Sequence, residues 1–422
     1  MAKPVSFIIA FFCGLLFYSQ AHGASLEKAF EGAVGFGQYT QGGRGGITYI
    51  VTSLDDSPEH PEPGTLRHAV KQKGARIIEF AVSGVIHLKD VLEITRDHIT
   101  INGQTSPYGI VIAGAQTSIK ANQVIIRYLR FRPGVKQGEG DALNARGRQD
   151  IIIDHCSLSW ANDEVASFYN NQRFTLQNSI ISESLKEAGH HKGSHGYGGI
   201  WGGAKASFIR NVIVHHDSRN PRINGYRLKP PYPQSETLVD IRNNVFYNWG
   251  DNSGYGAEGG KFNLINNFYK PGPASEAKHF FQFWAKPELP GTQAFIAGNE
   301  IDGRPDATEN NRLGLSVKNQ KKLSAEAVEA VYASTLVNIP FEQPDSTTLS
   351  PKEAYDLLII KGDVGANRNA GGEFQDSVDT RLLSEIRRGE PTFGNGLINT
   401  ELTVLSAGGW ADYAKEFSAG AQ

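Results

Sequence analysis

Short β-branched runs recur along this chain, and each one ends in a polar residue that further apolar residues follow. The clearest six runs are IIIDHCSL (151–158), FTLQNSII (174–181), SFIRNVIV (207–214), VDIRNNVF (239–246), FNLINNFY (262–269) and AFIAGNEI (294–301). The matching polar residues are His155, Asn178, Asn211, Asn243, Asn266 and Asn299, at spacings of 23, 33, 32, 23 and 33 residues. A repeat of at least about 20 residues, with one or two strands in each, indicates a solenoid.

The asparagines give this repeat a physical reason. A sharp bend between two strands favours left-handed backbone, which asparagine tolerates. Bends that stack at the strand spacing of about 4.8 Å bring the amides together, so we expect a ladder of bonded asparagines. The alternative is an antiparallel sandwich, whose hairpins would show two-residue Asn-Gly or Asp-Gly turns at short spacing. The pattern therefore favours an all-β chain folded as a parallel β-helix.

The C-terminal part of the chain changes character. Residues 325–335, 351–360 and 377–387 are predicted to form helices, and Ser350 is the expected N-cap before Pro351. We expect these helices to pack outside the stack or to cover its end, because an exposed terminal rung would be an aggregation edge. The predicted organisation is a β-helix domain over residues 24–310 and a partly helical extension over residues 311–422.

The first residues have the pattern of a signal peptide. Lys3 precedes an apolar run over residues 7–18, and Ala21-His22-Gly23 offers a cleavage site of the small-x-small kind. The run is too short to span a bilayer, so we expect residues 1–23 to be removed and the protein to be secreted, outside the cell or in the periplasm, with no membrane association. Cys156 is then the only cysteine, and no internal disulfide is expected.

The charge balance limits the classes of partner. The 42 Lys and Arg residues nearly match the 44 Asp and Glu residues, which leaves a net charge of −2. No global basic field attracts polyanions, and nucleic acid is not an expected partner. Affinity for an acidic polymer must come from a local basic patch or from a bound cation.

Two acidic segments lie about one repeat apart, at residues 138–141 (GEGD) and 162–164 (NDE). Carboxylates on neighbouring rungs can converge on one hard cation, and calcium takes six to eight oxygen ligands. Either segment alone could be a solvated loop. Together they make Ca2+ a candidate cofactor.

Residues 190–203 (HHKGSHGYGGIWGG) combine histidine, lysine, aromatic residues and six glycines. Zinc bound by the three histidines is one alternative, but their spacing matches no helix-based zinc motif. We favour a glycine-rich loop that presents Lys192, Tyr197 and Trp201 to a sugar, because aromatic faces and a cation suit a uronate ring. The histidines of this loop are His190, His191 and His195.

A further polar loop, residues 215–222 (HHDSRNPR), follows the strand predicted at 207–214. Arg219 and Arg222 flank Pro221, which stiffens the loop. Arginine binds carboxylates through two parallel bonds, although ordinary surface salt bridges would also explain this pattern.

Together these segments resemble the pectate lyases of polysaccharide lyase family 1. The similar segments are AFEGAVGFGQYTQGGRGG (29–46), GTLRHAV (64–70), INGQTSP (101–107), IDHCSLSW (153–160), HGYGGIWGG (195–203), the Arg-x-Pro loop and DSVDTRLLSEIRRG (376–389). The similarity extends along most of the mature chain, and the combination is highly specific. It implies a single-stranded, right-handed parallel β-helix of the pectin-lyase type.

The resemblance also implies roles for residues at matching positions. Asp141 and Asp163 match calcium ligands, Lys192 matches a catalytic lysine and Arg219 matches the catalytic base. Because free arginine has a pKa above 12, histidine is the chemically easier base. The second choices for the base are therefore His195 and His216.

Two positions depart from the family pattern. Ser167 stands where the family often has an aspartate, so either Glu164 supplies the missing oxygen or calcium arrives mostly with the substrate. Asn224 stands where the family often has a second arginine. The candidates for that second role are Arg222, Arg227 and Lys229.

The implied function is cleavage of de-esterified pectin (polygalacturonate) by calcium-assisted β-elimination, carried out by a monomer. The predicted substrate-binding residues are Arg222, Tyr197, Trp201 and His216. One alternative is a glycoside hydrolase on the same fold, which needs two carboxyl groups about 5–5.5 or 6.5–9.5 Å apart and leaves the Arg-x-Pro loop without a task. The other is a non-catalytic polysaccharide-binding β-helix, since the fold alone does not fix function.

Overall fold

The structure is a computed structural model that describes residue 1 and residues 26–419, except 285, 287, 345 and 346. The predicted signal peptide therefore lies outside the described residues, apart from Met1. In the described part of the chain, no helix is both long and apolar enough to cross a membrane.

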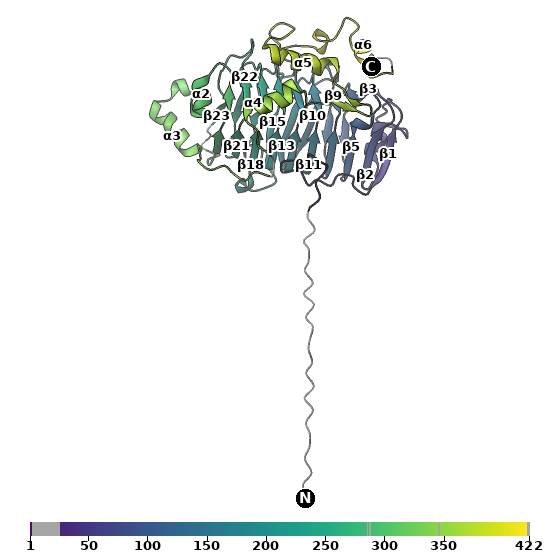
Figure 1. Cartoon of the computed structure of the whole chain (residues 1–422), viewed down its shortest axis with the longest axis horizontal. Helices are drawn as coiled ribbons and strands as arrows, with labels where there is room; N and C mark the ends of the chain where they lie inside the picture. The colour runs from purple at the N-terminus through teal and green to yellow at the C-terminus, as the bar shows by residue number, and fades with distance from the viewer. Residues whose placement is uncertain (2–25, 285, 287, 345–346, 420–422) are drawn as a thin grey trace.

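The chain coils into a stack of rungs (Figure 1). In the described residues, a 17-stranded parallel sheet bends to form two sides of the stack, and a 9-stranded parallel sheet forms the third side. We call these three sides sheets 1, 2 and 3. Sheet 1 contains β4 (Leu92–Ile94), β7 (Thr117–Ile119), β10 (Leu143–Arg146), the first part of β13 (Ala166–Gln177), the first part of β15 (Ile200–Ile209), β17 (Arg222–Ile223), β20 (Gly254–Gly256), β23 (Phe281–Phe283) and β26 (Leu315–Val317).

Sheet 2 contains β1 (Ile47–Val51), β2 (Arg76–Phe80), β5 (Ile99–Asn102), β8 (Val124–Arg127), β11 (Gln149–Asp154), the second parts of β13 and β15, β18 (Leu238–Arg242), β21 (Lys261–Ile265) and β24 (Gln293–Ala297). Sheet 3 contains β3 (Gly84–His87), β6 (Ile110–Ala113), β9 (Arg130–Arg132), β12 (Ser157–Ser159), β14 (Ile180–Ser182), β16 (Val212–Val214), β19 (Val245–Tyr247), β22 (Phe268–Lys270) and β25 (Glu300–Ile301).

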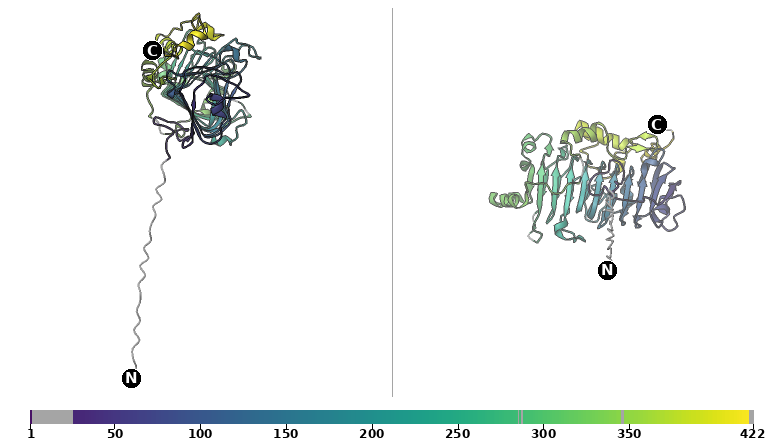
Figure 2. Two further views of the ribbon diagram at one scale, coloured as in Figure 1. Left: turned by 90° about the vertical axis from the view of Figure 1, so that its right-hand side faces the viewer. Right: turned by 60° about the horizontal axis from the view of Figure 1, so that its bottom comes forward.

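Seen along the stack, the strands surround one continuous interior (left view of Figure 2). Buried apolar side chains from all three sheets fill it as a single cluster. Aromatic residues stack from rung to rung, as in Phe246 of β19 against Tyr269 of β22, with ring centroids 4.6 Å apart. A core of this length provides the apolar burial that is needed because the described residues contain no disulfide.

The bend between sheets 2 and 3 uses two adjacent residues. The first is left-handed, as in His155 (φ 49°), Asn178 (φ 50°), Asn243 (φ 57°) and Asn266 (φ 51°). The residue after it points inward and bonds to the next rung. The asparagines of this inner ladder are Asn211, Asn244, Asn267, Asn299 and Asn311.

A ladder of bonded asparagines is therefore present, as predicted. Part of it is formed by the residue one position later in the sequence than predicted. Asn211 and Asn299 belong to it. Asn178, Asn243 and Asn266 instead provide the left-handed bend, and the residues after them reach the ladder: Ser179 through its backbone N, Asn244 and Asn267 through their amides. The reason is steric, because one residue cannot both turn the backbone at the corner and direct its side chain into the interior.

Replacing Asn244 by alanine is expected to lower the free energy of unfolding by about 1–3 kcal/mol. Its Oδ1 accepts bonds from the backbone N of Asn211 (2.9 Å) and from Asn211 Nδ2 (3.0 Å), so the substitution orphans buried donors. The midpoint of urea unfolding measures the effect. The exposed Asn338 is the control, and an equal shift in Asn338→Ala would contradict the ladder argument.

The C-terminal extension begins at the end of the stack, where Val328 and Tyr332 of its first long helix join the interior cluster, and then runs along the outside (Figure 1). Its elements are α3 (Ala325–Thr335), α4 (Pro351–Tyr355), the π-helical turn η6 (Asp356–Ile360), α5 (Ser377–Arg388), α6 (Trp410–Lys415) and the antiparallel pair β27 (Arg368–Asn369) and β28 (Gly372–Glu373). Ser350 and Glu353 form a capping box at α4, as the predicted N-cap requires. Leu358, Leu382 and Ile386 pack on the outer side of sheet 3. The stack itself continues past residue 310, since β26 pairs with β23.

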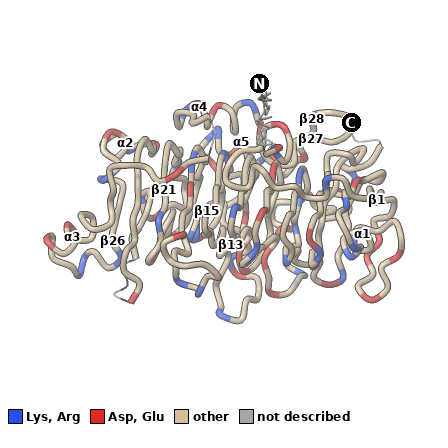
Figure 3. The backbone as a smooth tube through the Cα atoms, turned by 90° about the horizontal axis from the view of Figure 1, so that it is seen from below, with Lys and Arg blue, Asp and Glu red and all other residues tan. Residues whose placement is uncertain are grey.

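Two further α-helices are short. Helix α1 (Leu66–Lys71) lies near the first rungs, and α2 (Pro305–Glu309) follows β25. Basic and acidic residues are both distributed along the whole stack (Figure 3), in keeping with the small net charge.

Candidate active site

Four successive loops that lead from sheet 3 into sheet 1 carry the predicted site residues. Asp141 precedes β10, Asp163 and Glu164 precede β13, Tyr197 precedes β15 and Arg219 precedes β17. Isolated bridges pair Glu164 with Tyr197 and Tyr197 with Ser218, so the parallel register continues through these loops. Residues 21 and 33 positions apart in sequence are therefore stacked about 4.8 Å apart.

The carboxylates of Asp141, Asp163 and Glu164 converge, each with an oxygen within 4.8 Å of the other two. Asp141 is buried and accepts bonds from the Glu164 backbone N (3.0 Å) and from Asn144 Nδ2 (2.8 Å). Burial raises the pKa of Asp141 to about 7, with a smaller contribution from the charge of Asp163 and against the lowering effect of the bond from Asn144. The three carboxylates offer hard oxygen donors, and their negative charge exceeds the positive charge of the groups around them. Both features fit a calcium ion.

Arg219 faces this cluster from the next rungs. Its guanidinium forms an ion pair with Glu164 and lies over the Tyr197 ring, with Cζ 4.3 Å from the ring centroid. Ser167 donates a bond to Glu164 Oε2 (3.1 Å), which fixes that carboxylate between Ser167 and Arg219. The site thus holds an arginine against a carboxylate cluster, with the tyrosine ring as a support.

The histidine-rich loop closes one side of the cluster. The rings of His190 and His195 stack in parallel, with centroids 3.8 Å apart. His195 Nε2 lies 3.0 Å from Asp163 Oδ1, and burial lowers the pKa of His195, as does the neighbouring His190. Lys192 is exposed on this loop, and its backbone N donates to His190 Nδ1 (3.1 Å).

Two predicted substrate contacts are wrong. Trp201 is 1% exposed, stacks on Phe208 in the interior and donates its Nε1–H to the Ala166 carbonyl (3.2 Å). His216 is fully buried, its Nε2 lies 3.0 Å from the Ile181 carbonyl oxygen, and burial lowers its pKa to about 3. Neither ring can reach a sugar, and His216 is also excluded as a base.

Arg222 lies on the sheet 1 side but is already paired. It donates to Glu258 Oε1 (2.6 Å) and lies over the rings of Tyr255 and Trp284. Asn224 donates to Asn170 Oδ1 (2.9 Å) and is fully buried. The sequence left open which residue takes the role of a second arginine in the site. Arg222 is already paired and Asn224 has no guanidinium, so neither position supplies a free one.

The structure adds basic residues that the sequence analysis missed. A cleft of about 350 Å³ runs from the carboxylates along the outer face of sheet 1. Its walls include Lys120, Arg146, Arg148 and Tyr169, and Arg146 Cζ lies 4.5 Å from the Tyr169 ring centroid. Strand alternation was the available signal, since Asn144 and Arg146 of β10 must face the same side.

No family model matches this chain. Curated proteins with similar sequences do match it. A protein of Aspergillus terreus named "Probable pectate lyase C" is 33% identical over 380 residues, which cover 87% of this chain and 78% of that protein. Its namesake in Aspergillus flavus is 33% identical over 405 residues, covering 92% of this chain and 84% of that protein.

Solved structures agree in fold. The major allergen from cedar pollen, jun a 1, superposes with a TM-score of 0.57 at 19% identity, over 79% of this chain and 92% of the allergen. A pectate lyase from Paenibacillus sp. 0602 gives a TM-score of 0.51 at 14% identity, over 85% of this chain and 99% of that enzyme. The predicted right-handed parallel β-helix of the pectin-lyase type is confirmed. With 33% identity along more than three quarters of its curated relatives, the chain belongs to the pectate lyase family.

Proposed function

We propose that this protein is a secreted lyase that cleaves de-esterified pectin (polygalacturonate) by calcium-assisted β-elimination and releases unsaturated oligogalacturonides. The observation that carries the proposal is the contact of Arg219 with a cluster of three carboxylates through Glu164. Curated relatives with the name pectate lyase support the reaction class. A solved pectate lyase bound to a hexasaccharide has the same fold, with a TM-score of 0.51.

Asp141, Asp163 and Glu164 are the proposed calcium ligands. When bound, the cation would neutralise a substrate carboxylate and make the neighbouring C5 proton more acidic. The protein's part is to keep these oxygens in place. Asn144 and the Glu164 backbone N hold Asp141, and Ser167 holds Glu164.

Arg219 is the proposed base. In its neutral form, which a bound cation and Lys192 nearby would favour, Arg219 takes the proton from C5. The C5–H electrons form the C4–C5 double bond, and the C4–O bond breaks with its electrons on the leaving oxygen, which takes a proton from water. The ion pair with Glu164 and the Tyr197 ring position the guanidinium before substrate arrives. Lys192 holds a substrate carboxylate from the exposed loop, and His195 remains the second candidate for the base.

The proposed path of the polymer follows the cleft on sheet 1. Lys120, Arg146 and Arg148 supply positive charge there, and arginine binds carboxylates through two bonds. Lys120 and Arg146 lie on neighbouring rungs about 4.8 Å apart, because Ala145 of β10 pairs with Ile119 of β7, and Arg148 follows on the same rung as Arg146. These cations could meet carboxylates of an acidic polysaccharide.

The test is the ultraviolet absorbance of polygalacturonate during incubation with the mature protein. We expect absorbance from the unsaturated product end to rise with calcium and to stop when a chelator removes it. Restoring calcium after chelation is the control for damage to the protein. Cleavage without this absorbance would contradict the lyase and indicate a hydrolase, and absence of cleavage would favour a binding module.

The remaining parts of the proposal concern export and organisation. We propose that residues 1–23 direct secretion, that residues 24–310 carry the catalytic function and that residues 311–422 stabilise sheet 3, with the protein acting as a monomer. Expression of the complete gene followed by N-terminal sequencing of the exported protein tests the cleavage position, which is expected after Gly23.

A further inference from the structure

Glu401 is a buried carboxylate of the C-terminal extension, and it bonds to the loop that carries Asp141. We call this loop, residues 134–141, the first site loop. Glu401 is 3% exposed. Its Oε2 accepts a bond from the backbone N of Val135 (3.0 Å), and its Oε1 accepts one from Trp410 Nε1 (3.1 Å). Asp141 follows Val135 by six residues, so Glu401 holds the start of the loop that ends in a proposed calcium ligand.

The first site loop approaches Glu401 more closely than a side chain would allow. Gly134 has a positive φ (77°), and a Cβ there would lie 2.9 Å from Glu401 Oε1 and 3.4 Å from Cζ2 of Trp410. Glycine is therefore required at this position. The Trp410 ring also packs edge-on against Trp160, three residues before Asp163, with ring centroids 5.5 Å apart. The extension thus contacts the chain just before both proposed aspartate ligands.

The same segment of the extension holds a second site loop, residues 185–195. Ile398 forms a parallel bridge with Leu185, and the Ile398 carbonyl accepts a bond from the backbone N of Lys186 (2.9 Å). The Lys186 carbonyl accepts a bond from the backbone N of His195 (2.7 Å), which closes this loop at its base. The base of the second site loop is therefore bonded to the extension as well.

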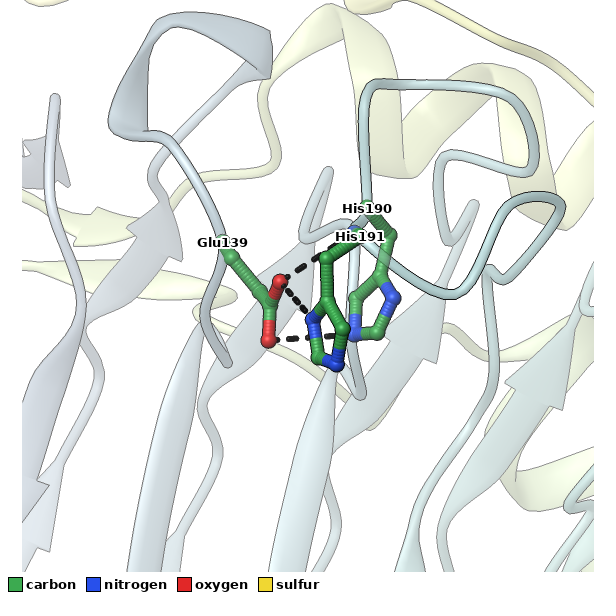
Figure 4. A group of neighbouring side chains, drawn as sticks. All are labelled: Glu139, His190 and His191. Atoms are coloured by element: carbon green, nitrogen blue, oxygen red, sulfur yellow. Dashed lines mark hydrogen bonds and ion pairs between the residues drawn. The ribbon is translucent and has the colours of Figure 1, made fainter.

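The two site loops also contact each other. Glu139 of the first loop accepts a bond from the backbone N of His191 (3.3 Å), and its Oε1 lies 3.3 Å from His190 Nε2 (Figure 4). Asn162, which precedes Asp163, donates its Nδ2 to a carbonyl of the second loop (3.1 Å). A shift of either loop therefore reaches the carboxylate cluster.

We propose that Glu401 is a positioning residue of the active site, which keeps Asp141 in place for the cation by holding the first site loop. The extension is then a working part of the site in addition to a cover on sheet 3. This inference rests on the proposed function, in which Asp141 is a calcium ligand. Groups that support metal ligands typically change metal affinity or activity about 10–100-fold when they are removed.

The test compares Glu401→Ala with the parent, each as the complete mature chain, with Ca2+ as the probe. Alanine leaves the N–H groups of Val135 and Trp410 without this acceptor. We expect calcium affinity, measured by calorimetry, to fall about 10–100-fold. Amide hydrogen exchange over residues 134–141 should become about 5–150-fold faster, the factor that corresponds to an unsatisfied buried donor.

The dependence of cleavage on calcium gives a further readout that a purely structural role would not move. The rate of polygalacturonate cleavage by Glu401→Ala should fall at limiting calcium. It should return close to the parental rate at saturating calcium, because excess cation occupies the weakened site.

Glu416→Ala is the matched control. Glu416 also accepts a bond from a backbone N and one from a side chain, both of Ser377 (2.8 and 2.5 Å), but these bonds lie within the extension. This variant should keep the parental calcium affinity and the parental exchange over residues 134–141. If Glu401→Ala unfolds, as judged by thermal unfolding, Glu401→Gln repeats the test with a smaller expected loss, since its single amide oxygen replaces only one of two acceptors.

The proposal is overturned if folded Glu401→Ala keeps the parental calcium affinity and the parental exchange over residues 134–141. It is also overturned if Glu416→Ala shows equal losses, because the effect would then be a general loosening of the extension. A parent protein that neither binds calcium nor cleaves polygalacturonate would contradict the proposed function instead, and the exchange comparison would still decide whether Glu401 holds the loop.

Discussion

Replacing Arg219 by lysine is expected to lower the rate of polygalacturonate cleavage by about 10²–10⁴-fold, the usual contribution of a positioned acid or base. Lysine keeps the positive charge, so the ion pair with Glu164 and the electrostatics of the cluster are preserved. Lysine lacks the planar guanidinium that lies over the Tyr197 ring, and its ammonium group occupies a different position. The proton at C5 is then out of reach. Initial rates from the rise of absorbance measure the effect.

The same Arg219→Lys protein should bind calcium and unfold as the parent does, which separates a chemical defect from a structural one. Arg173→Lys is the matched control, because Arg173 is exposed and pairs with Asp150 (2.6 Å) away from the cluster. It should cleave at the parental rate. If Arg219→Lys keeps more than about a tenth of the parental rate, Arg219 is not the base and His195 becomes the candidate.

Replacing Asp376 by asparagine is expected to destabilise the protein by about 3–5 kcal/mol, the range for breaking a buried ion pair. Asp376 is 1% exposed and pairs with Arg130 and with Arg132 Nη1 (3.1 Å). It also caps α5 by accepting bonds from the backbone N of Val378 and of Asp379. An asparagine removes the charge and leaves two buried guanidinium groups without full compensation.

The lower midpoint of urea unfolding would measure this loss. Asp412→Asn serves as the control, because Asp412 lies in helix α6 of the same extension but pairs with Lys415 at the surface. Its effect should be within about 0.5 kcal/mol, as for most surface changes. Equal losses in the two variants would show that the Asp376 network does not hold the extension to sheet 3.

The sequence was informative wherever a signal repeats in every rung. The β-branched runs predicted the strands, and the polar residue after each run predicted the corners, because both follow from backbone chemistry that is local. The ladder was shifted at Asn243 and Asn266 for a reason that is not local. Which of two adjacent polar residues faces inward depends on how the next rung stacks.

The active site shows the same division between features that local sequence predicts and features that depend on tertiary packing. The acidic segments and Arg219 could be assigned to neighbouring rungs from spacing and resemblance, and the structure does bring them together. Trp201 could not be placed, since side chains alternate along a strand and a shift of one residue reverses inside and outside. The start of β15 at Ile200 puts Trp201 in the core, in register with Phe168, while Tyr197 stays outside.

By itself, the sequence determined that the chain forms stacked parallel rungs with a polar edge, because strand propensity and left-handed corners are properties of short segments. Only the tertiary structure decided which side chains contact one another. Asp376 meets Arg130 and Arg132, which lie 246 and 244 residues away, and Asp163 meets the histidines of the following loop. These contacts depend on how the extension folds back over sheet 3 and on the register of each irregular loop, and no local pattern encodes either.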